Sequence, residues 1–147
     1  MKEIKLKISN YLQNHQKMTL ATVNSQGNPV AHTVEYVPDG AAVYFATKKD
    51  TRKAQNIIQN GNVAYTVDED YEDWMKIQGI QIEGTASVVT GEDEVNRVFA
   101  LYIERFPFVA DFPPNPDLIF IKVEPRVAYF LDYEKGFTHR DRVTYSV

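Results

Sequence analysis

Basic and hydroxyl side chains are concentrated directly after an apolar segment at residues 42–46. They are Thr47, Lys48, Lys49, Thr51, Arg52 and Lys53. A helix starting here would already carry unpaired backbone N–H groups and a partial positive charge in its first turn. Cations at that place oppose the helix dipole unless an anion binds among them, and phosphate suits amides, hydroxyls and cations together. The alternative is a solvated charged loop capped by Asp50 or Thr51.

Few other side chains indicate chemistry performed by the protein itself. The chain has no cysteine, and its three histidines, His15, His32 and His139, are far apart and outside the usual metal-ligand spacings. The nucleophile-elbow, zinc-protease, P-loop and dinucleotide-binding motifs do not occur. We therefore expect no metal site, and we expect any enzymatic reactivity to come from a bound cofactor.

The segments that must position the basic cluster do not follow a regular strand–helix alternation. Periodicity predicts helices at residues 3–15, 52–59 and 92–106. It predicts strands at 18–24, 30–37, 42–47, 63–67, 79–89, 118–123 and 126–131, the last two separated by Glu124-Pro125. Tight turns near Gly27 and Gly40 favour an antiparallel meander, and Gly84 within a strand indicates a bend or a close backbone approach. The predicted fold is α+β and mainly β, with a barrel-like sheet of six strands, one fewer than the seven predicted segments, and two or three helices.

Three remaining segments suggest surfaces rather than catalysis. The acidic segment at residues 68–74 lacks the glycine turn of a Ca²⁺ loop, so we interpret it as a solvated loop. The proline- and aromatic-rich segment at 107–116 includes Phe108 and Phe112, which would cover a pocket or fill a dimer interface. The C-terminal tail carries a second basic group, made of Lys135, His139, Arg140 and Arg142.

Three local patterns, in order and in register, resemble a known family. The first is Leu20-Ala21-Thr22-Val23 followed by residues 27–29 and 30–36. The second is Tyr44-Phe45-Ala46-Thr47 followed by Thr51-Arg52-Lys53 and Asn56-Ile57. The third spans Ile80 to Ala86. Together they resemble the pyridoxamine 5′-phosphate oxidase-like FMN-binding split barrels. The resemblance implies a single domain over residues 1–147, folded as a six-stranded antiparallel split β-barrel.

The resemblance also implies an FMN site. In the family a Ser/Thr-Arg-Lys run clamps the FMN phosphate, which corresponds here to Thr51, Arg52 and Lys53, with Thr47 and Lys48 upstream. The second strand lines the flavin ring, which corresponds to His32, Thr33 and Val34. A polar contact to the flavin edge corresponds to Gln78 or Gln81, between which the sequence does not decide. A hydrogen-bonded core histidine is the alternative for His32.

The implied activity is that of a flavin-dependent oxidoreductase acting on a small molecule, with NAD(P)H as a candidate electron donor. The family builds its cofactor sites across a homodimer interface, to which His139 and Arg140 would contribute. The chain is shorter than true pyridoxamine phosphate oxidases, and only His32 stands where they have extra basic residues, so vitamin B6 oxidation is not expected. The alternatives are a non-catalytic flavin- or haem-binding sensor, with His139 as a candidate axial ligand, and a deazaflavin protein.

Bulk composition narrows the partners and the compartment. The 147 residues are 44% hydrophobic and 24% charged, with a net charge of −4, so nucleic acid is not an expected partner. No apolar run approaches the length of a membrane span, and the N-terminal segment lacks the apolar core of a signal peptide. We therefore expect a cytoplasmic protein with no membrane association.

Overall fold

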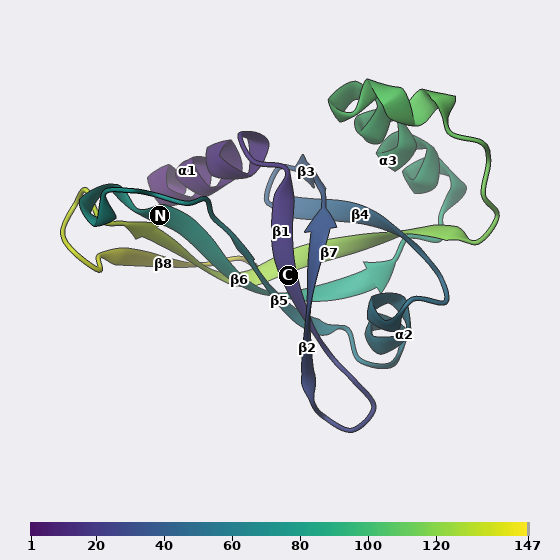
Figure 1. The fold of residues 1–147 in the computed structure, drawn as a ribbon, viewed down its shortest axis with the longest axis horizontal. Coiled ribbons are helices and arrows are strands. Elements are labelled where there is room, and N and C mark those ends of the chain that lie inside the picture. Colours follow the sequence, from purple (N-terminus) through teal and green to yellow (C-terminus); the bar gives the residue numbers. More distant parts are fainter. Residues whose placement is uncertain (147) are drawn as a thin grey trace.

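The computed structural model describes residues 1–146 and consists mainly of strands (Figure 1). The helices are α1 (Lys2–Gln13), α2 (Arg52–Gln59) and α3 (Glu92–Arg105), with short 3-10 helices η1 (Trp74–Lys76) and η2 (Pro107–Asp111). The strands are β1 (Lys17–Val23), β2 (Pro29–Glu35), β3 (Val37–Asp39), β4 (Ala42–Lys48), β5 (Asn62–Val67), β6 (Gln78–Val88), β7 (Leu118–Asp132) and β8 (Arg140–Thr144). None of the helices in this range is long and apolar enough to span a bilayer.

The two strands at the opposite ends of the sheet, β2 and β3, follow one another in the chain, so the sheet must curl to bring its ends together. Its order is β2-β1-β5-β6-β7-β4-β3, with β8 added beside β7, and every strand pair is antiparallel. Only Tyr36 separates β2 from β3, so both ends of the sheet meet at this residue. Tyr36 is fully buried, and its hydroxyl donates to the carbonyl oxygen of Leu12 in α1 at 2.8 Å. The predicted split barrel is confirmed, although the sheet has eight strands rather than six.

Residues 118–132 form one long strand, so the prediction of two separate strands is wrong. One part of β7 pairs with β4 and the other with β8, while β6 runs beside both. The predicted break at Glu124-Pro125 is a bulge, where the register shifts between Glu83 and Gly84 on β6. Proline is tolerated at a bulge because it has no N–H to donate. Gly84 permits the close approach there, since a Cβ would lie 2.4 Å from the Glu124 carbonyl oxygen.

The core is divided between the two faces of β4. Successive strand residues point to opposite sides, so Phe45 enters the main core while Tyr44 faces α3. The main core fills the barrel and includes Ile8 of α1 and Ile57 of α2. The smaller core joins α3 to the outside of β4 through residues such as Tyr102. The helix α2 therefore packs on the barrel side of β4, whereas α3 packs on the opposite side.

The basic C-terminal tail contains β8, a strand that the sequence analysis did not predict. In this strand Arg140 is opposite Leu131 of β7, and Arg142 is opposite Tyr129. The turn before β8 is held by Asp141, whose carboxylate lies 3.2 Å from both Lys135 Nζ and His139 Nε2. The second basic group is thus spread along a paired strand and the turn before it.

Candidate functional site

Two threonine hydroxyls meet where β4 ends and α2 begins. Thr47 is buried, with its Oγ1 lying 2.8 Å from Thr51 Oγ1. Thr51 caps α2: its Oγ1 accepts from the Ala54 N–H at 3.3 Å and donates to the Lys48 carbonyl oxygen at 3.0 Å. The Thr47 hydroxyl also lies 3.4 Å from the Lys48 carbonyl oxygen, so either threonine can be the donor between the two hydroxyls. The helix cap is therefore Thr51 and not Asp50.

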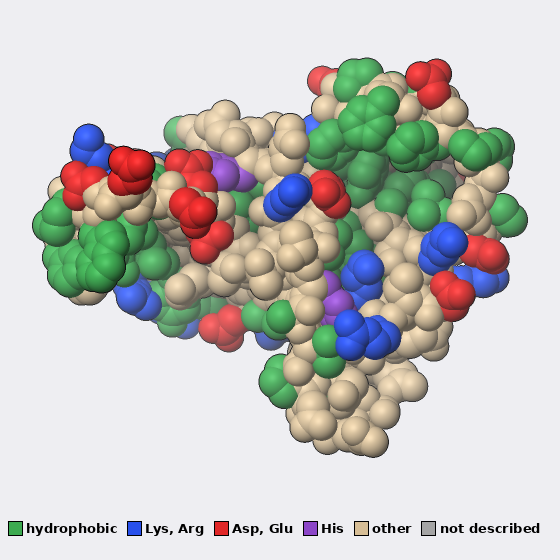
Figure 2. Space-filling model, viewed as in Figure 1, with side chains coloured by type: hydrophobic (Ala, Val, Ile, Leu, Met, Phe, Trp, Pro, Cys, Tyr) green, Lys and Arg blue, Asp and Glu red, His purple; other side chains and the backbone are tan. Residues whose placement is uncertain are grey.

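Arg52 and Lys53 are the first two residues of α2, and the first turn of the helix contains no acidic side chain. Their charges reach β2, because they lower the pKa of His32 in addition to the larger effect of burial. Figure 2 shows Lys and Arg side chains close to a histidine in the region where Figure 1 places α2 and β2. The two threonines, two cations and a helix N-terminus form what we call the phosphate corner: Thr47, Thr51, Arg52 and Lys53. Its donors fit a phosphomonoester, which carries about −1.5 to −2 charge at pH 7.

The other two cations of the sequence cluster point elsewhere. Lys48 is the last residue of β4 and is paired with Leu118, so strand alternation places it on the face opposite to Thr47. Lys49 forms an ion pair with Asp117 at 3.4 Å, and its N–H donates to the Asp117 carbonyl oxygen at 2.9 Å. Of the four predicted basic residues, Arg52 and Lys53 are the two that lie in the first turn of α2.

His32 is part of a polar network that links β1, β2 and α2. Its Nε2 lies 3.0 Å from Oγ1 of Thr22, a fully buried residue of β1. The same oxygen accepts from Asn56 Nδ2 of α2 at 2.9 Å. Burial, and then the charges of Lys53 and Arg52, lower the pKa of His32 and favour the neutral ring. The Thr22 hydroxyl can then donate to Nε2, leaving the proton of the neutral ring on Nδ1.

Thr22 and Asn56 were not among the predicted site residues. Thr22 alternates with Leu20 on the buried face of β1, and Asn56 lies one helical turn after Arg52. A threonine on an otherwise apolar strand face was the available sequence signal for Thr22. Nothing local indicated that it would meet Asn56, because these residues are 34 positions apart.

The predicted ring-contacting residues of β2 divide between two faces. Val34 is buried in the main core and His32 shares its face, whereas Thr33 is exposed on the outer face. A row of paired residues crosses that outer face from β2 to β8, namely Thr33, Thr19, Thr66, Gln81, Tyr129 and Arg142. Gln81 is exposed in this row, so it shares a face with Thr33.

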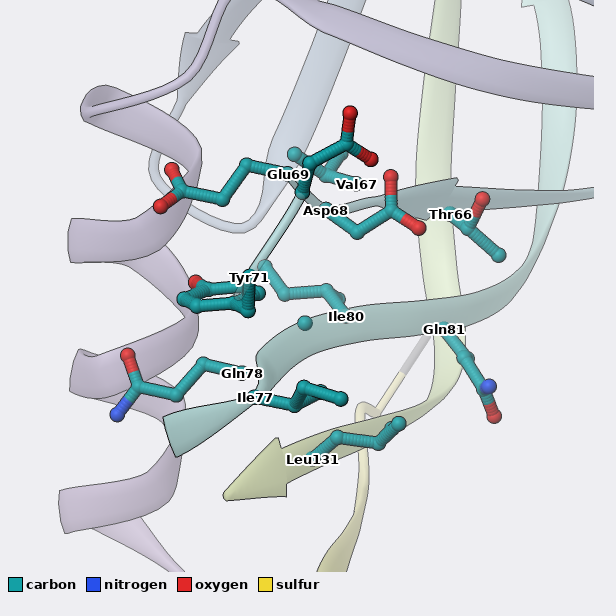
Figure 3. Close-up of a pocket in the computed structure, with 12 residues that line it drawn as sticks. Thr66, Val67, Asp68, Glu69, Tyr71, Ile77, Gln78, Ile80, Gln81 and Leu131 are labelled. Atoms are coloured by element: carbon teal, nitrogen blue, oxygen red, sulfur yellow. The ribbon is translucent and has the colours of Figure 1, made fainter. Parts of the chain in front are cut away.

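Gln78 lies in a different environment, in a small pocket of about 240 Å³ between β6 and the acidic segment (Figure 3). The side-chain Nε2 of Gln78 donates to Asp132 Oδ1 at 3.4 Å, and its backbone carbonyl oxygen accepts from the Tyr11 hydroxyl of α1 at 3.1 Å. Figure 3 shows Gln78 extending towards α1 and Gln81 extending to the other side of β6. Gln78 begins β6, ten residues or about 33 Å along the strand from Val88, whose partner on β7, Ile121, pairs in turn with Phe45 of β4. Within one chain the structure does not bring Gln78 to the phosphate corner.

Comparison with known proteins identifies the family. Residues 4–132 match the family model described as pyridoxamine 5′-phosphate oxidase, so the chain belongs to the pyridoxamine 5′-phosphate oxidase family. General stress protein 26 of Bacillus subtilis is 28% identical over 123 residues, which is 84% of each protein.

Two solved structures share the fold. The general stress protein 26 from Bacillus anthracis superposes with a TM-score of 0.70 at 22% identity, covering 96% of this chain and 99% of that one. HutZ, the heme storage protein from Vibrio cholerae, superposes with a TM-score of 0.71 at 23% identity, covering 82% of this chain and 89% of that one. At these identities the likeness establishes the split barrel, and the ligand must be argued from the residues.

Proposed function

We propose that this chain binds FMN and acts as a flavin-dependent oxidoreductase on a small molecule. The observation that carries the proposal is the phosphate corner, where two hydroxyls and two cations surround a helix N-terminus that has no acidic side chain. In the absence of an anion, this arrangement costs helix stability, because each cation opposes the dipole by about 0.3–1 kcal/mol. A bound phosphate would be attracted both by the two cations and by the positive end of the helix dipole, so it would offset this cost.

The residues of the corner would divide the binding of the phosphate between them. Thr51 orients the first turn of α2, while Arg52 and Lys53 supply charge-assisted hydrogen bonds. The outer face of the sheet would seat the flavin ring, with Thr33 and Gln81 as polar contacts at its edge. FMN would supply the hydride and electron transfer, and the protein would hold and orient it.

A homodimer would complete the site, and two observations support this part of the proposal. The outer face at the β2 end of the sheet carries small residues, where Ala21 is paired with Ala31 of β2 and with Ala64 of β5. Such a face allows close approach of a second sheet or of a flat ring. Gln78 could also reach the flavin only from the partner subunit, given its distance from the corner.

Haem binding on the same fold is the second candidate, since HutZ is a heme storage protein. Among residues 1–146, however, each histidine Nε2 faces a protein oxygen. His15 faces Glu69 at 2.8 Å, His32 faces Thr22 at 3.0 Å and His139 faces Asp141 at 3.2 Å. The Nε2 atom of His139, the candidate axial ligand, is buried and makes no hydrogen bond, since its approach to Asp141 is an ion pair only when the ring is protonated. A haem iron would have to displace the oxygen beside His15 or His32, or reach a buried nitrogen at His139, so the residues favour a flavin.

The proposal is tested by titrating the purified protein separately with FMN, riboflavin, a deazaflavin and haemin. We expect saturable FMN binding, seen as quenching of flavin fluorescence, and markedly weaker binding of riboflavin because it lacks the phosphate. Bleaching of the bound flavin by NADH or NADPH, with turnover on an added acceptor, would support the oxidoreductase over a sensor. A Soret band with haemin and no FMN binding would contradict the proposal.

A further inference from the structure

An apolar hollow of about 650 Å³ lies between α3, η2 and the start of β7. Its walls include Phe99, Phe112, Pro114, Pro116, Leu118 and Phe120. Phe112 is 61% exposed, Phe99 45% and Leu118 44%, so a large part of this apolar surface still faces water. Figure 2 shows a hollow edged by hydrophobic side chains in the region where Figure 1 places α3 and the loop that follows it. The volume falls within the range of small-molecule pockets, which is about 300–1,000 Å³.

A chain of aromatic rings joins two residues of the hollow's wall, Phe120 and Phe112, through three rings that do not line it. The ring of Phe120 stacks on Tyr102 at 5.5 Å, and Tyr102 contacts Phe106 at 6.1 Å. Phe106 then contacts Phe108 at 6.0 Å, and Phe108 contacts Phe112 at 5.8 Å. These centroid distances are those of favourable aromatic pairs. A flat aromatic guest placed between Phe112 and Phe120 would extend this packing.

The wall of the hollow is fixed to the rest of the fold. Asn115 Oδ1 accepts from the Asp117 N–H at 3.0 Å, and the Asn115 carbonyl oxygen accepts from the Leu118 N–H at 3.1 Å. Asp117 is held in turn by the backbone and the side chain of Lys49. Three prolines in the same segment restrict the backbone further. The site is therefore preformed, which reduces the ordering cost of binding.

One cation at the edge of the hollow has no acidic partner. Lys48 lies opposite Leu118 and on the same face of the sheet as Leu118 and Phe120. It forms no ion pair within residues 1–146, whereas the neighbouring Lys49 is paired with Asp117 at 3.4 Å. The apolar hollow thus has, beside its lining residue Leu118, a lysine without an ion pair among residues 1–146.

We propose that this hollow is a second small-molecule site, which binds a flat aromatic molecule carrying one acidic group. The ring system packs between Phe112 and Phe120, and the carboxylate or sulfonate approaches Lys48. The site lies on the α3 side of β4, whereas the phosphate corner lies on the α2 side. The proposal therefore does not depend on flavin binding.

The test uses the full chain and two naphthalene probes of equal size, 2-naphthoate and uncharged 2-naphthol. Each is titrated by isothermal calorimetry into the wild type, and into Phe112→Ser and Lys48→Gln variants. Phe137→Ser is the matched control for the first variant, because Phe137 is also an exposed phenylalanine, 53% accessible, and does not line the hollow. Lys76→Gln is the control for the second, because Lys76 is an exposed lysine of η1 that does not line the hollow. Sedimentation of every variant reports the oligomeric state.

We expect one naphthoate per chain, with Phe112→Ser weakening both probes by about fivefold or more through lost apolar contact. Lys48→Gln should weaken naphthoate but leave naphthol unchanged, and neither control should alter affinity. Absence of saturable binding, or equal losses in Phe112→Ser and Phe137→Ser, would overturn the proposal. If Phe112→Ser instead dissociates a dimer without changing probe binding, the hollow is an interface between two copies of the chain. If the wild-type protein binds naphthoate but not FMN, this second site is supported and the proposed flavin site is not.

Discussion

Reversing the charges of Arg52 and Lys53 should change stability and ligand affinity in opposite directions. Both residues lie in the first turn of α2, where cations oppose the helix dipole and anions favour it. In the ligand-free protein, Arg52→Glu together with Lys53→Glu should therefore raise the free energy of unfolding. Counting only the two new anions, the gain is about 0.6–2 kcal/mol. Arg, Lys and Glu have similar helix propensities, so that factor does not confound the comparison.

The same double substitution should greatly weaken FMN binding. A hydrogen bond to a charged group contributes about 1.5–3 kcal/mol, and the lower value applies here because Arg52 is exposed to solvent. Two such bonds give about 3 kcal/mol, which is about a hundredfold in Kd. Riboflavin has no phosphate, so its affinity should stay within about twofold of the wild-type value.

Two measurements on one set of proteins check this prediction. Urea unfolding of the ligand-free protein, at a single protein concentration, gives stability, and quenching of flavin fluorescence gives affinity. Lys17→Glu together with Lys76→Glu is the control for affinity, because it makes the same total charge change at two exposed residues outside the corner. If the double variant is less stable than the wild type, or if riboflavin weakens as much as FMN, the two cations serve the fold and the phosphate argument is wrong.

Three further predictions concern single positions. The folded-state pKa of His32 is lowered from 6.5, so as the pH falls the unfolded chain takes up a proton on this ring before the folded chain does. The free energy of unfolding should therefore fall as the pH drops below 6.5. His32→Gln should reduce this pH dependence, measured by urea unfolding at several pH values. Thr51→Ala removes the cap that accepts from Ala54 N–H and should lower the unfolding free energy by about 1 kcal/mol, whereas an unchanged melting temperature would show that the cap is not needed. Gly84→Ala places a Cβ 2.4 Å from the Glu124 carbonyl oxygen and should cost about 1–3 kcal/mol; a variant as stable as wild type in the same denaturation assay would contradict the close approach.

Local signals were sufficient to predict the bounds of α2, although they left its cap open between Asp50 and Thr51. Thr51 supplies a cap whose hydroxyl accepts from the third N–H of the helix, and residues 52–59 have helical periodicity. A helix of this length depends mainly on residues within a few positions of one another, so its sequence carries the information. The presence of Gly84 at a bend was predicted for a similar reason, because glycine within a strand marks a backbone approach that other residues cannot make.

Strand continuity and pairing depend on partners far away in the chain, so they were only partly predictable. Pro125 looked like the end of a strand, but Gly84 on the neighbouring strand accommodates a bulge there and lets β7 continue. The strand β8 has a short polar sequence without an apolar pattern, and its pairing with β7 provides the order that its composition does not. Helical contacts are local, whereas sheet contacts are not.

The sequence alone determined which side chains are available at the candidate site: hydroxyls and cations at the start of a helix whose first turn has no acidic residue. Only the tertiary structure decided which of these residues act together. It turned Lys48 away from Arg52 and Lys53, placed Gln81 and Gln78 in different surroundings, and joined Thr22 to Asn56 beside His32. The physical reason is that side-chain alternation and cross-strand register select the partners, and one residue of shift in a strand reverses every face.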